Sequence, residues 1–253
     1  MHRGHATLLA LLPALGRALA MQVSHPSMEP TYASLTSRLL ERLGSKDQYW
    51  VGIGGGPGCG KSTLTARVAA LVNDRVSEEV CVVLPMDGYH YSRAKLRELD
   101  PPDASELLPR RGSPWTFDAE ACYSELSAAK AAGHAELPTY CRKLSDPVPS
   151  GVSLKRSHRL VLVEGNYLLL RSDARWEPLS SLFDEAWFIE CDDPAEQRRR
   201  LIARHLETWN EEKTRRWGEG EAGAAARADS NDCLNMKLVE PCARWADLVV
   251  KSV

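Results

Sequence analysis

A glycine-rich segment near residue 55 contains residue types that can bind a chain of phosphates. The text VGIGGGPGCGKST begins at Val51, and it fits the pattern G-x-x-x-x-G-K-[ST] from Gly55 to Ser62. In such a loop, glycines let backbone N–H groups face phosphate oxygens, and the next helix points the positive end of its dipole at the same anion. Lys61 is predicted to reach the β- and γ-phosphates of ATP as a catalytic residue, and Ser62 to offer its hydroxyl to Mg²⁺. The predicted nucleotide-binding residues are Gly55, Gly56, Pro57, Gly58, Cys59, Gly60, Lys61, Ser62 and Thr63.

Cys59 lies inside this loop, where the start of a helix can lower the pKa of a thiol. A small residue that fills a tight turn is the alternative interpretation, and the sequence leaves the redox sensitivity of Cys59 open. The chain has 7 cysteines without a C-x-x-C pair. This spacing predicts reduced thiols rather than a zinc site or a disulfide framework.

Three acidic residues follow apolar runs that are predicted to be strands. Asp87 follows residues 80–84, Glu164 follows residues 160–163, and Asp192 follows residues 185–189. In a doubly wound sheet, ligands bind outside the carboxyl ends of the strands.

A kinase for a hydroxyl acceptor needs one carboxylate that takes the hydroxyl proton and another that helps to hold Mg²⁺. We therefore expect Asp87 to be the catalytic base and Glu164 to bind the metal together with Ser62. A turn or cap role is the alternative for Asp87. Asp192 precedes Asp193 and Pro194, which together are typical of a helix start, and a capping role is favoured for it.

A strongly basic helix is predicted over residues 194–209. Arg200 and Arg204 are four positions apart, so they share one face of it. Arginines on a closing lid stabilise the charge of a phosphoryl-transfer transition state and exclude water. We expect both arginines to be catalytic, with a solvated charged face as the alternative.

These residues need elements that bring them together. Short apolar runs predict strands over residues 49–53, 79–84, 159–163, 185–189 and 248–250. Helical spacing predicts helices over residues 32–43, 61–72, 118–132 with Asp118 as N-cap, and 194–209, with partial helix over 224–235. Residues 99–114 are expected to form an exposed excursion, 138–149 a loop, and 210–223 a mobile segment.

Alternation of apolar strands with helices predicts an α/β fold of the P-loop NTPase type. Its parallel sheet of about five strands would have helices on both faces and a helical lid around residues 195–223. Residues 1–28 contain no acidic residue, and the apolar run over residues 6–15 is too short to span a bilayer. We expect an N-terminal extension or transit segment there, a kinase domain over residues 29–253, and a cytoplasmic or organellar location.

The chain has 253 residues and a formal net charge of −2. This charge gives no basic signature for nucleic acid, and no partner nucleic acid or membrane is expected. The sequence leaves a homodimer open.

Several further motifs occur in a characteristic order. After GGGPGCGKST come PMDGYHYSR, RRGSPWTFD, VEGNYLLL, WFIECDDPAEQRRRLIARH and SNDCLN. Over about residues 30–250 the chain resembles the phosphoribulokinase/uridine kinase family of P-loop kinases, in particular its uridine kinase-like, nucleoside/nucleotide kinase branch. The resemblance implies that Asp87 is the catalytic base, that Glu164 lies near Mg²⁺ and that Arg200 and Arg204 belong to the lid.

The resemblance also implies an acceptor site. Tyr89 and His90 would line the acceptor pocket, and Tyr140, Arg142 and Asp146 would contact the acceptor. Residues Arg227, Asn231 and Asp232 fall in the stretch that supports the nucleotide base or the lid. Trp115 and Phe117 would supply either a stacking surface or ordinary core aromatics.

The loop near residue 140 departs from the family pattern. Relatives often carry a Tyr/Phe-Asp pair and a His-Asp-Pro or Lys-Asp-Pro there, whereas this chain reads Tyr140-Cys141 and Ser145-Asp146-Pro147. The acceptor of a relative therefore cannot be transferred to this chain.

The predicted function is ATP-dependent and Mg²⁺-dependent phosphorylation of a hydroxyl on a small metabolite, such as a sugar, a nucleoside or a vitamin-like compound. A P-loop ATPase or a nucleotide-dependent binding module without acceptor kinase activity is the alternative.

Overall fold

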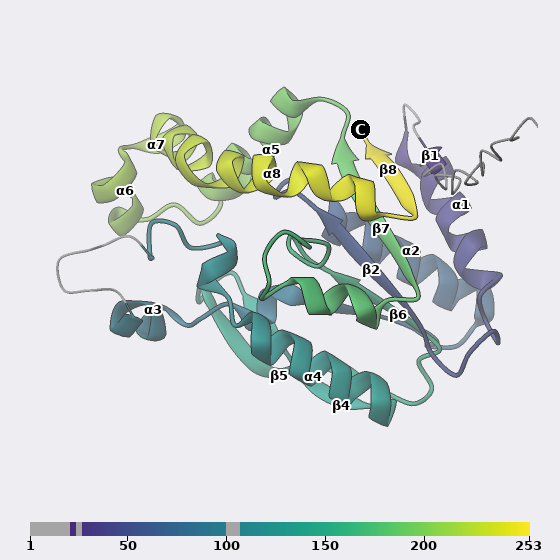
Figure 1. Ribbon diagram of the computed structural model, residues 1–253. Coiled ribbons are helices and arrows are strands. Elements are labelled where there is room, and N and C mark those ends of the chain that lie inside the picture. Colours follow the sequence, from purple (N-terminus) through teal and green to yellow (C-terminus); the bar gives the residue numbers. More distant parts are fainter. Residues whose placement is uncertain (1–20, 24–26, 100–106) are drawn as a thin grey trace, which may run out of the picture.

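A computed structural model describes residues 21–23, 27–99 and 107–253 of the protein (Figure 1). Its centre is a six-stranded sheet with the strand order β1-β8-β7-β2-β6-β3, in which every pairing is parallel. The strands are β1 (Met21–Val23), β2 (Tyr49–Gly55), β3 (Cys81–Pro85), β6 (Leu160–Glu164), β7 (Glu185–Cys191) and β8 (Leu248–Ser252).

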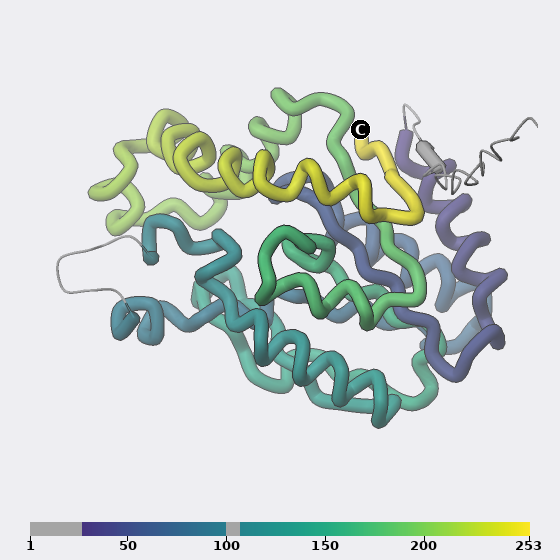
Figure 2. The backbone as a smooth tube through the Cα atoms, in the orientation of Figure 1, coloured from purple at the N-terminus to yellow at the C-terminus, as the bar shows by residue number. Residues whose placement is uncertain are grey.

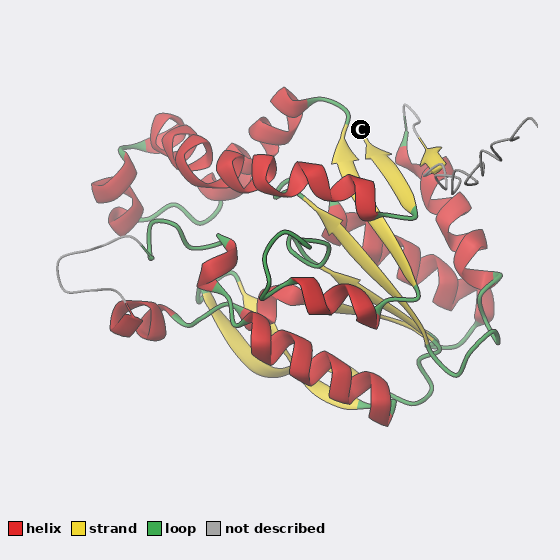
Figure 3. Ribbon diagram, in the orientation of Figure 1, coloured by secondary structure: helices red, strands yellow, loops and turns green. Residues whose placement is uncertain are grey.

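Both faces of this sheet are covered, as the continuous apolar strands predict. Along β2, Trp50 packs into one core while Val51 and Ile53 pack into the other. The core that contains Val51 includes side chains of α1 (Met28–Leu40) and α2 (Lys61–Val76). The core that contains Trp50 includes side chains of α4 (Ala119–Ala132). Figure 3 shows these helices flanking the strands.

The remaining helices lie at the carboxyl ends of the strands or beyond them. They are α3 (Arg93–Leu99), α5 (Pro194–Leu206), α6 (Glu211–Trp217), α7 (Gly220–Arg227) and α8 (Cys233–Val239). A π-helical turn, Ala228–Asp232, joins α7 to α8. The backbone in Figure 2 runs from α5 away from the sheet and returns along α8 before it enters β8.

Two segments differ from the sequence prediction. Residues 138–149 were expected to be a loop, but they belong to an antiparallel hairpin of β4 (Ala135–Cys141) and β5 (Asp146–Leu154). The three prolines at 138, 147 and 149 hide the strands from sequence-based prediction, because proline is rare inside paired strands. Residues 210–223 were expected to be mobile but contain α6 and the start of α7, with Asn210 as the N-cap of α6.

Smaller corrections concern helix and sheet ends. The N-cap of α5 is Asp193, whose carboxylate accepts from the Ala195 N–H at 2.8 Å, and not Asp192 as predicted. Asp118 caps α4 as predicted. The five predicted strands are confirmed, and β1 adds a sixth at the edge, where Met21 pairs with Leu248.

The extension or transit segment predicted for residues 1–28 lies mostly outside the described residues, as does part of the predicted excursion at 99–114. Among the residues that the structure describes, no helix has the length and apolar character needed to cross a membrane.

Candidate active site

A cleft of about 600 Å³ lies between the phosphate loop, the β4–β5 hairpin and the lid helices. Among the predicted site residues it is lined by Pro57, Gly58, Gly60, Lys61, Ser62, Thr63, Asp87, His90, Tyr140, Arg142, Glu164, Arg200 and Arg204. Gly55, Gly56, Cys59, Tyr89 and Asp146 are absent from its lining. Residues from five separate motifs of the sequence therefore meet in one space.

The Lys61 ammonium group lies at the base of the phosphate loop. It donates to the carbonyl oxygens of Gly55 at 2.8 Å and Gly56 at 2.9 Å, and to Asn166 Oδ1 at 2.8 Å. Lys61 is the first residue of α2, and Gly60 precedes it with φ 92°, a left-handed conformation that favours glycine. A positive charge is thus fixed beside the backbone N–H groups at the start of a helix, which is an anion-binding arrangement.

The phosphate loop is packed tightly against α5. Gln197 Nε2 donates to the Pro57 carbonyl oxygen at 2.8 Å. A Cβ atom at Gly58, where φ is 80°, would lie 2.9 Å from Leu201 Cγ and 3.1 Å from the Gln197 carbonyl oxygen. Only glycine fits there without displacing the helix that carries Arg200 and Arg204.

Cys59 is buried inside the loop, with 1% of its surface exposed. Burial raises the pKa of its thiol, although the Lys61 charge acts in the opposite direction. The protonated, enclosed thiol fits the interpretation of a small residue that fills a turn. All seven cysteines are free.

Two carboxylates meet at the carboxyl ends of neighbouring strands. Glu164 ends β6, and its Oε1 accepts a hydrogen bond from Ser62 Oγ at 2.9 Å. Asp87 follows β3, which pairs with β6 so that Pro85 lies opposite Glu164. Burial raises the pKa of Glu164, and the Asp87 charge also raises it, whereas Lys61 lowers it. The Asp87 side chain lines the cleft, and no hydrogen bond or ion pair of its carboxylate is found within the described residues.

Ser62 and Glu164 fit a magnesium ion by the chemistry of their donors. A hydroxyl and a carboxylate are hard oxygen ligands, and Mg²⁺ usually takes only one or two such protein ligands beside water and substrate phosphates. No group of three or more His, Cys, Asp or Glu that could hold a metal occurs in the described part of the chain.

An aromatic wall faces the carboxylates. The His90 ring lies 3.8 Å from the Phe117 ring and 4.8 Å from the Tyr140 ring, measured between centroids. Its Nδ1 is 2.8 Å from the Asp87 carbonyl oxygen, and burial lowers the pKa of His90. All three rings line the cleft, so they can hold the body of a small organic molecule next to Asp87.

Two residues predicted to contact the acceptor lie elsewhere. The Tyr89 side chain is 5% exposed and belongs to the core under α4, where its hydroxyl donates to Glu125 Oε2 at 3.1 Å. Asp146 accepts from the Arg93 N–H at 2.8 Å and from Arg111 Nη2 at 2.9 Å. Its role in this geometry is to hold Arg111, which does line the cleft.

The opposite wall of the cleft belongs to the lid. Arg200 Nε lies 2.8 Å from Glu196 Oε1, and Arg204 Nη2 lies 3.7 Å from Asp232 Oδ1. Asp232 also lies 2.8 Å from His205 Nε2. Asp232 belongs to the π-helical turn after α7, and such turns often occur at functional sites.

Three side chains at the site received no role from the sequence alone. Asn166 binds the Lys61 ammonium group and belongs to the VEGN motif, two residues after the end of a strand. Gln197 fixes the phosphate loop to α5. Arg111 binds Asp146 of the hairpin and also donates from Nη2 to the Tyr91 carbonyl oxygen at 3.0 Å. The only signal for it in the sequence was its position in the RRGSPWTFD motif.

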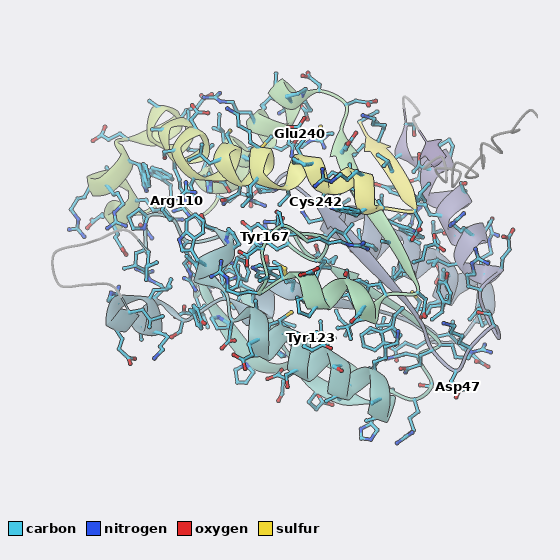
Figure 4. All side chains as sticks on the ribbon, in the orientation of Figure 1. Asp47, Arg110, Tyr123, Tyr167, Glu240 and Cys242 are labelled. Atoms are coloured by element: carbon cyan, nitrogen blue, oxygen red, sulfur yellow. The ribbon has the colours of Figure 1, made fainter. Side chains whose placement is uncertain are left out.

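Hydrogen bonds join residues 110–112 to the segment after β6 and to the π-helical turn between α7 and α8. Tyr167, seen near the centre of the molecule in Figure 4, donates its hydroxyl to the Gly112 carbonyl oxygen. Arg110, beside the C-terminal helices in Figure 4, donates to the Ser230 carbonyl oxygen at 2.7 Å. Asn231 Nδ2 donates to the Arg111 carbonyl oxygen at 2.8 Å. These bonds set the distance between Arg111 and the lid.

The parallel sheet with a phosphate loop after β2, an acid after β3 and a basic helix over the loop define a P-loop kinase. Similarity to known proteins supports this class. "Putative uridine kinase C227.14" of Schizosaccharomyces pombe is 33% identical over 237 residues, which is 93% of this chain and 96% of that protein. The chain therefore belongs to the phosphoribulokinase/uridine kinase family of P-loop kinases and is an ATP-dependent kinase of small metabolites.

Solved structures give the same assignment. A crystal structure described as a "putative fructose transport system kinase" from Silicibacter sp. TM1040 has a TM-score of 0.72 and 30% identity, over 86% of this chain and 98% of that one. YFH7 from Saccharomyces cerevisiae, described as "a putative P-loop containing kinase with a circular permutation", has a TM-score of 0.70 over 89% of this chain and 98% of that one. Its identity of 17% shows a shared fold alone. No family model matches the chain.

Proposed function

We propose that this kinase transfers the γ-phosphoryl group of ATP, with Mg²⁺, to a hydroxyl group of its acceptor. The observation that carries the proposal is the position of Asp87. Its carboxylate lines the cleft near Glu164, which is bonded to Ser62, and no hydrogen bond or ion pair of that carboxylate is found within the described residues. A carboxylate in this position can accept the proton of an incoming hydroxyl.

The proposed transfer exchanges one phosphorus–oxygen bond for another. The acceptor oxygen forms a bond to the γ-phosphorus, and the bond from that phosphorus to the β–γ bridging oxygen breaks, which releases ADP. The hydroxyl proton passes to the Asp87 carboxylate and then to solvent. Lys61, Arg200 and Arg204 stabilise the negative charge that spreads over the transferred group. Mg²⁺ held by Ser62 and Glu164 would neutralise charge on the β- and γ-phosphates.

The names of the relatives support only a chemical class of acceptor for this chain, not a particular compound. One relative is named for uridine and one solved structure for a fructose transport system. A nucleoside and a sugar share hydroxyl groups, which supports a hydroxyl acceptor here.

A panel of hydroxyl metabolites incubated with the protein, ATP and Mg²⁺ tests the proposal by ADP release and by mass spectrometry of the product. We expect ADP release that depends on one class of acceptor, and a product heavier by one phosphoryl group. We expect Asp87→Asn to lower kcat by about 10²–10⁴-fold, the range of general base catalysis, with little change in ATP affinity. Full transfer activity in that variant would refute the assignment of Asp87. ADP release without any acceptor would favour an ATPase.

A further inference from the structure

The cleft carries more positive charge than the residues assigned to ATP account for. Its lining includes nine Lys or Arg side chains but five Asp or Glu side chains, whereas the whole chain has a net charge of −2. Three of the cations belong to the phosphate loop and the lid helix. The other six are Arg93, Arg111, Arg142, Lys213, Arg216 and Arg227.

Three of these six are engaged by the protein itself. Arg111 Nη2 forms an ion pair with Asp146 Oδ1 at 2.9 Å, and the same guanidinium donates to the Tyr91 and Ser145 carbonyl oxygens. Arg93 Nη2 forms an ion pair with Glu212 Oε2 at 2.6 Å. Lys213 Nζ donates to the Thr208 hydroxyl at 2.7 Å and to its carbonyl oxygen at 2.5 Å. The last two contacts hold lid segments in place, and all three cations have local partners.

Arg227 at the end of α7 has no such partner. No hydrogen bond or ion pair of its guanidinium is found within the described residues, and its Nε is buried without an acceptor. A buried donor without a partner costs about 1–3 kcal/mol. Asp232 is the acid whose charge acts on it most, but that carboxylate already contacts Arg204 and His205.

Arg227 lines the cleft, and its charge interacts with Tyr140 and Arg111 on the acceptor side as well as with Asp232 and Arg204 of the lid. The Arg111 guanidinium in turn lies 5.5 Å from the centre of the Tyr140 ring, and its Nε is also buried without an acceptor. Two guanidinium groups therefore lie near the aromatic wall, and the described residues supply no hydrogen-bond acceptor for the Nε–H of either one.

Arg142 adds a third guanidinium on the same side. It lies in the turn of the β4–β5 hairpin, is exposed, lines the cleft and is close enough to Glu164 to interact with its charge. No side-chain partner of Arg142 is found within the described residues. Guanidinium groups bind carboxylate and phosphate through paired hydrogen bonds. A neutral ligand would leave the charges of Arg142 and Arg227 without an ion-pair partner among the described residues, whereas Arg111 is already paired with Asp146.

We propose that the acceptor is an anionic hydroxy compound, whose carboxylate or phosphate group is bound by Arg111, Arg142 and Arg227. The body of the acceptor lies against His90, Phe117 and Tyr140, and its hydroxyl reaches Asp87. This inference rests on the proposed function, because it names the substrate class of the same site.

Anion binding to the nucleotide-loaded protein is the first test, and it does not require the natural acceptor. Inorganic phosphate and malonate are titrated by calorimetry into protein saturated with Mg²⁺ and a non-hydrolysable ATP analogue. We expect one anion site that Arg227→Gln weakens about tenfold or more, while Arg227→Lys retains part of the affinity. The matched control is Arg215→Gln, which removes the same charge from an exposed position of α6 outside the cleft. Absence of anion binding, or equal affinity in Arg227→Gln and the control, would overturn the proposal.

The second test compares pairs of compounds that differ only in the anionic group. Glycerate is paired with glycerol, pantothenate with pantothenyl alcohol, ribose 5-phosphate with ribose, and uridine monophosphate with uridine. We expect the anionic member of the accepted pair to have a kcat/KM at least about tenfold higher. Arg227→Gln should raise KM for that acceptor without raising KM for ATP. Equal kcat/KM within the accepted pair would overturn the proposal, and an effect on ATP alone would assign Arg227 to the nucleotide.

The two proposals fail in different ways. Asp87→Asn should abolish transfer but retain the anion site, because its side chain is not among the three arginines. Loss of the anion site with transfer to neutral acceptors intact would overturn the anionic acceptor alone. ADP release without any acceptor would overturn the proposed function, while the anion titration still decides the inference.

Discussion

Substitution of Gly58 by alanine should damage the kinase through α5 rather than through the loop itself. The residue has φ 80°, and an added Cβ would lie 2.9 Å from Leu201 Cγ and 3.1 Å from the Gln197 carbonyl oxygen. A left-handed conformation costs an alanine about 1 kcal/mol relative to glycine. Forcing an extra carbon into a packed contact costs about 1–3 kcal/mol more. We therefore expect Gly58→Ala to lower the free energy of unfolding by about 2–4 kcal/mol.

Gly44 provides a matched control for this prediction. It has nearly the same φ, 82°, but nothing lies within 4 Å of an added Cβ. Gly44→Ala should therefore show the conformational cost of about 1 kcal/mol without the collision. For a chain of this size about 1 kcal/mol corresponds to a Tm change of about 2–4 °C. By differential scanning fluorimetry we expect a loss on the order of 10 °C for Gly58→Ala and about 3 °C for Gly44→Ala.

Catalysis should separate the two variants further. Displacement of α5 moves Arg200 and Arg204 relative to the phosphate loop, so Gly58→Ala should also lower kcat, whereas Gly44→Ala should leave kcat unchanged. Equal Tm losses in the two variants, with equal kcat, would refute the idea that close contact at Gly58 positions the lid.

Three further predictions concern single side chains. Lys61→Ala should weaken ATP binding by about 2 kcal/mol or more, because a charged hydrogen-bond donor to the phosphates is lost; unchanged ATP affinity by calorimetry would contradict its role. Arg204→Ala should lower kcat about 10-fold or more with a smaller effect on ATP affinity, and an effect confined to KM in steady-state assays would exclude the lid role. Burial lowers the pKa of His90 below its ordinary 6.5, so stability should fall as pH drops below about 6.5, because the unfolded chain then binds a proton that the buried ring does not. Tm measured between pH 5 and 7.5 should depend less steeply on pH in His90→Gln; because burial also lowers the pKa of His158, part of the slope should remain, and an unchanged slope would contradict burial of a neutral His90.

The parts of the fold that follow from local pattern were predictable from the sequence. The apolar runs of β2, β3, β6, β7 and β8 predict a sheet that is buried on both faces, and the spacing of the glycines predicts the phosphate loop. Asp118 signals the start of α4 through its own hydrogen bond to the Ala121 N–H, which is a contact within the segment. Such signals need only neighbouring residues.

The errors came where distant contacts decide the structure. The β4–β5 hairpin has weak alternation and three prolines, but it packs on the turn after β3, where a Cβ added at Gly88 would lie only 2.2 Å from the Pro138 carbonyl oxygen. The charged segment at 210–223 becomes helical because contacts such as Arg93–Glu212 and the packing of Trp209 hold it on the cleft. The family resemblance implied that Tyr89 lines the acceptor pocket, whereas its side chain is buried and its hydroxyl donates to Glu125 of α4.

The separation of the hairpin from the main sheet has an evolutionary consequence. The phosphate loop, Glu164 and Asp87 belong to strands of the main sheet or to the turns that follow them, whereas Tyr140 and Arg142 belong to a second sheet of only β4 and β5. Substitutions in the hairpin can therefore change which acceptor binds, while the residues that bind ATP stay the same. The close approach at Gly88 limits this freedom to the side chains and turn of the hairpin, because its backbone cannot shift away from Asp87 without loss of that contact. A lineage with this architecture can therefore acquire a new acceptor through substitutions in the hairpin while the catalytic residues stay in place.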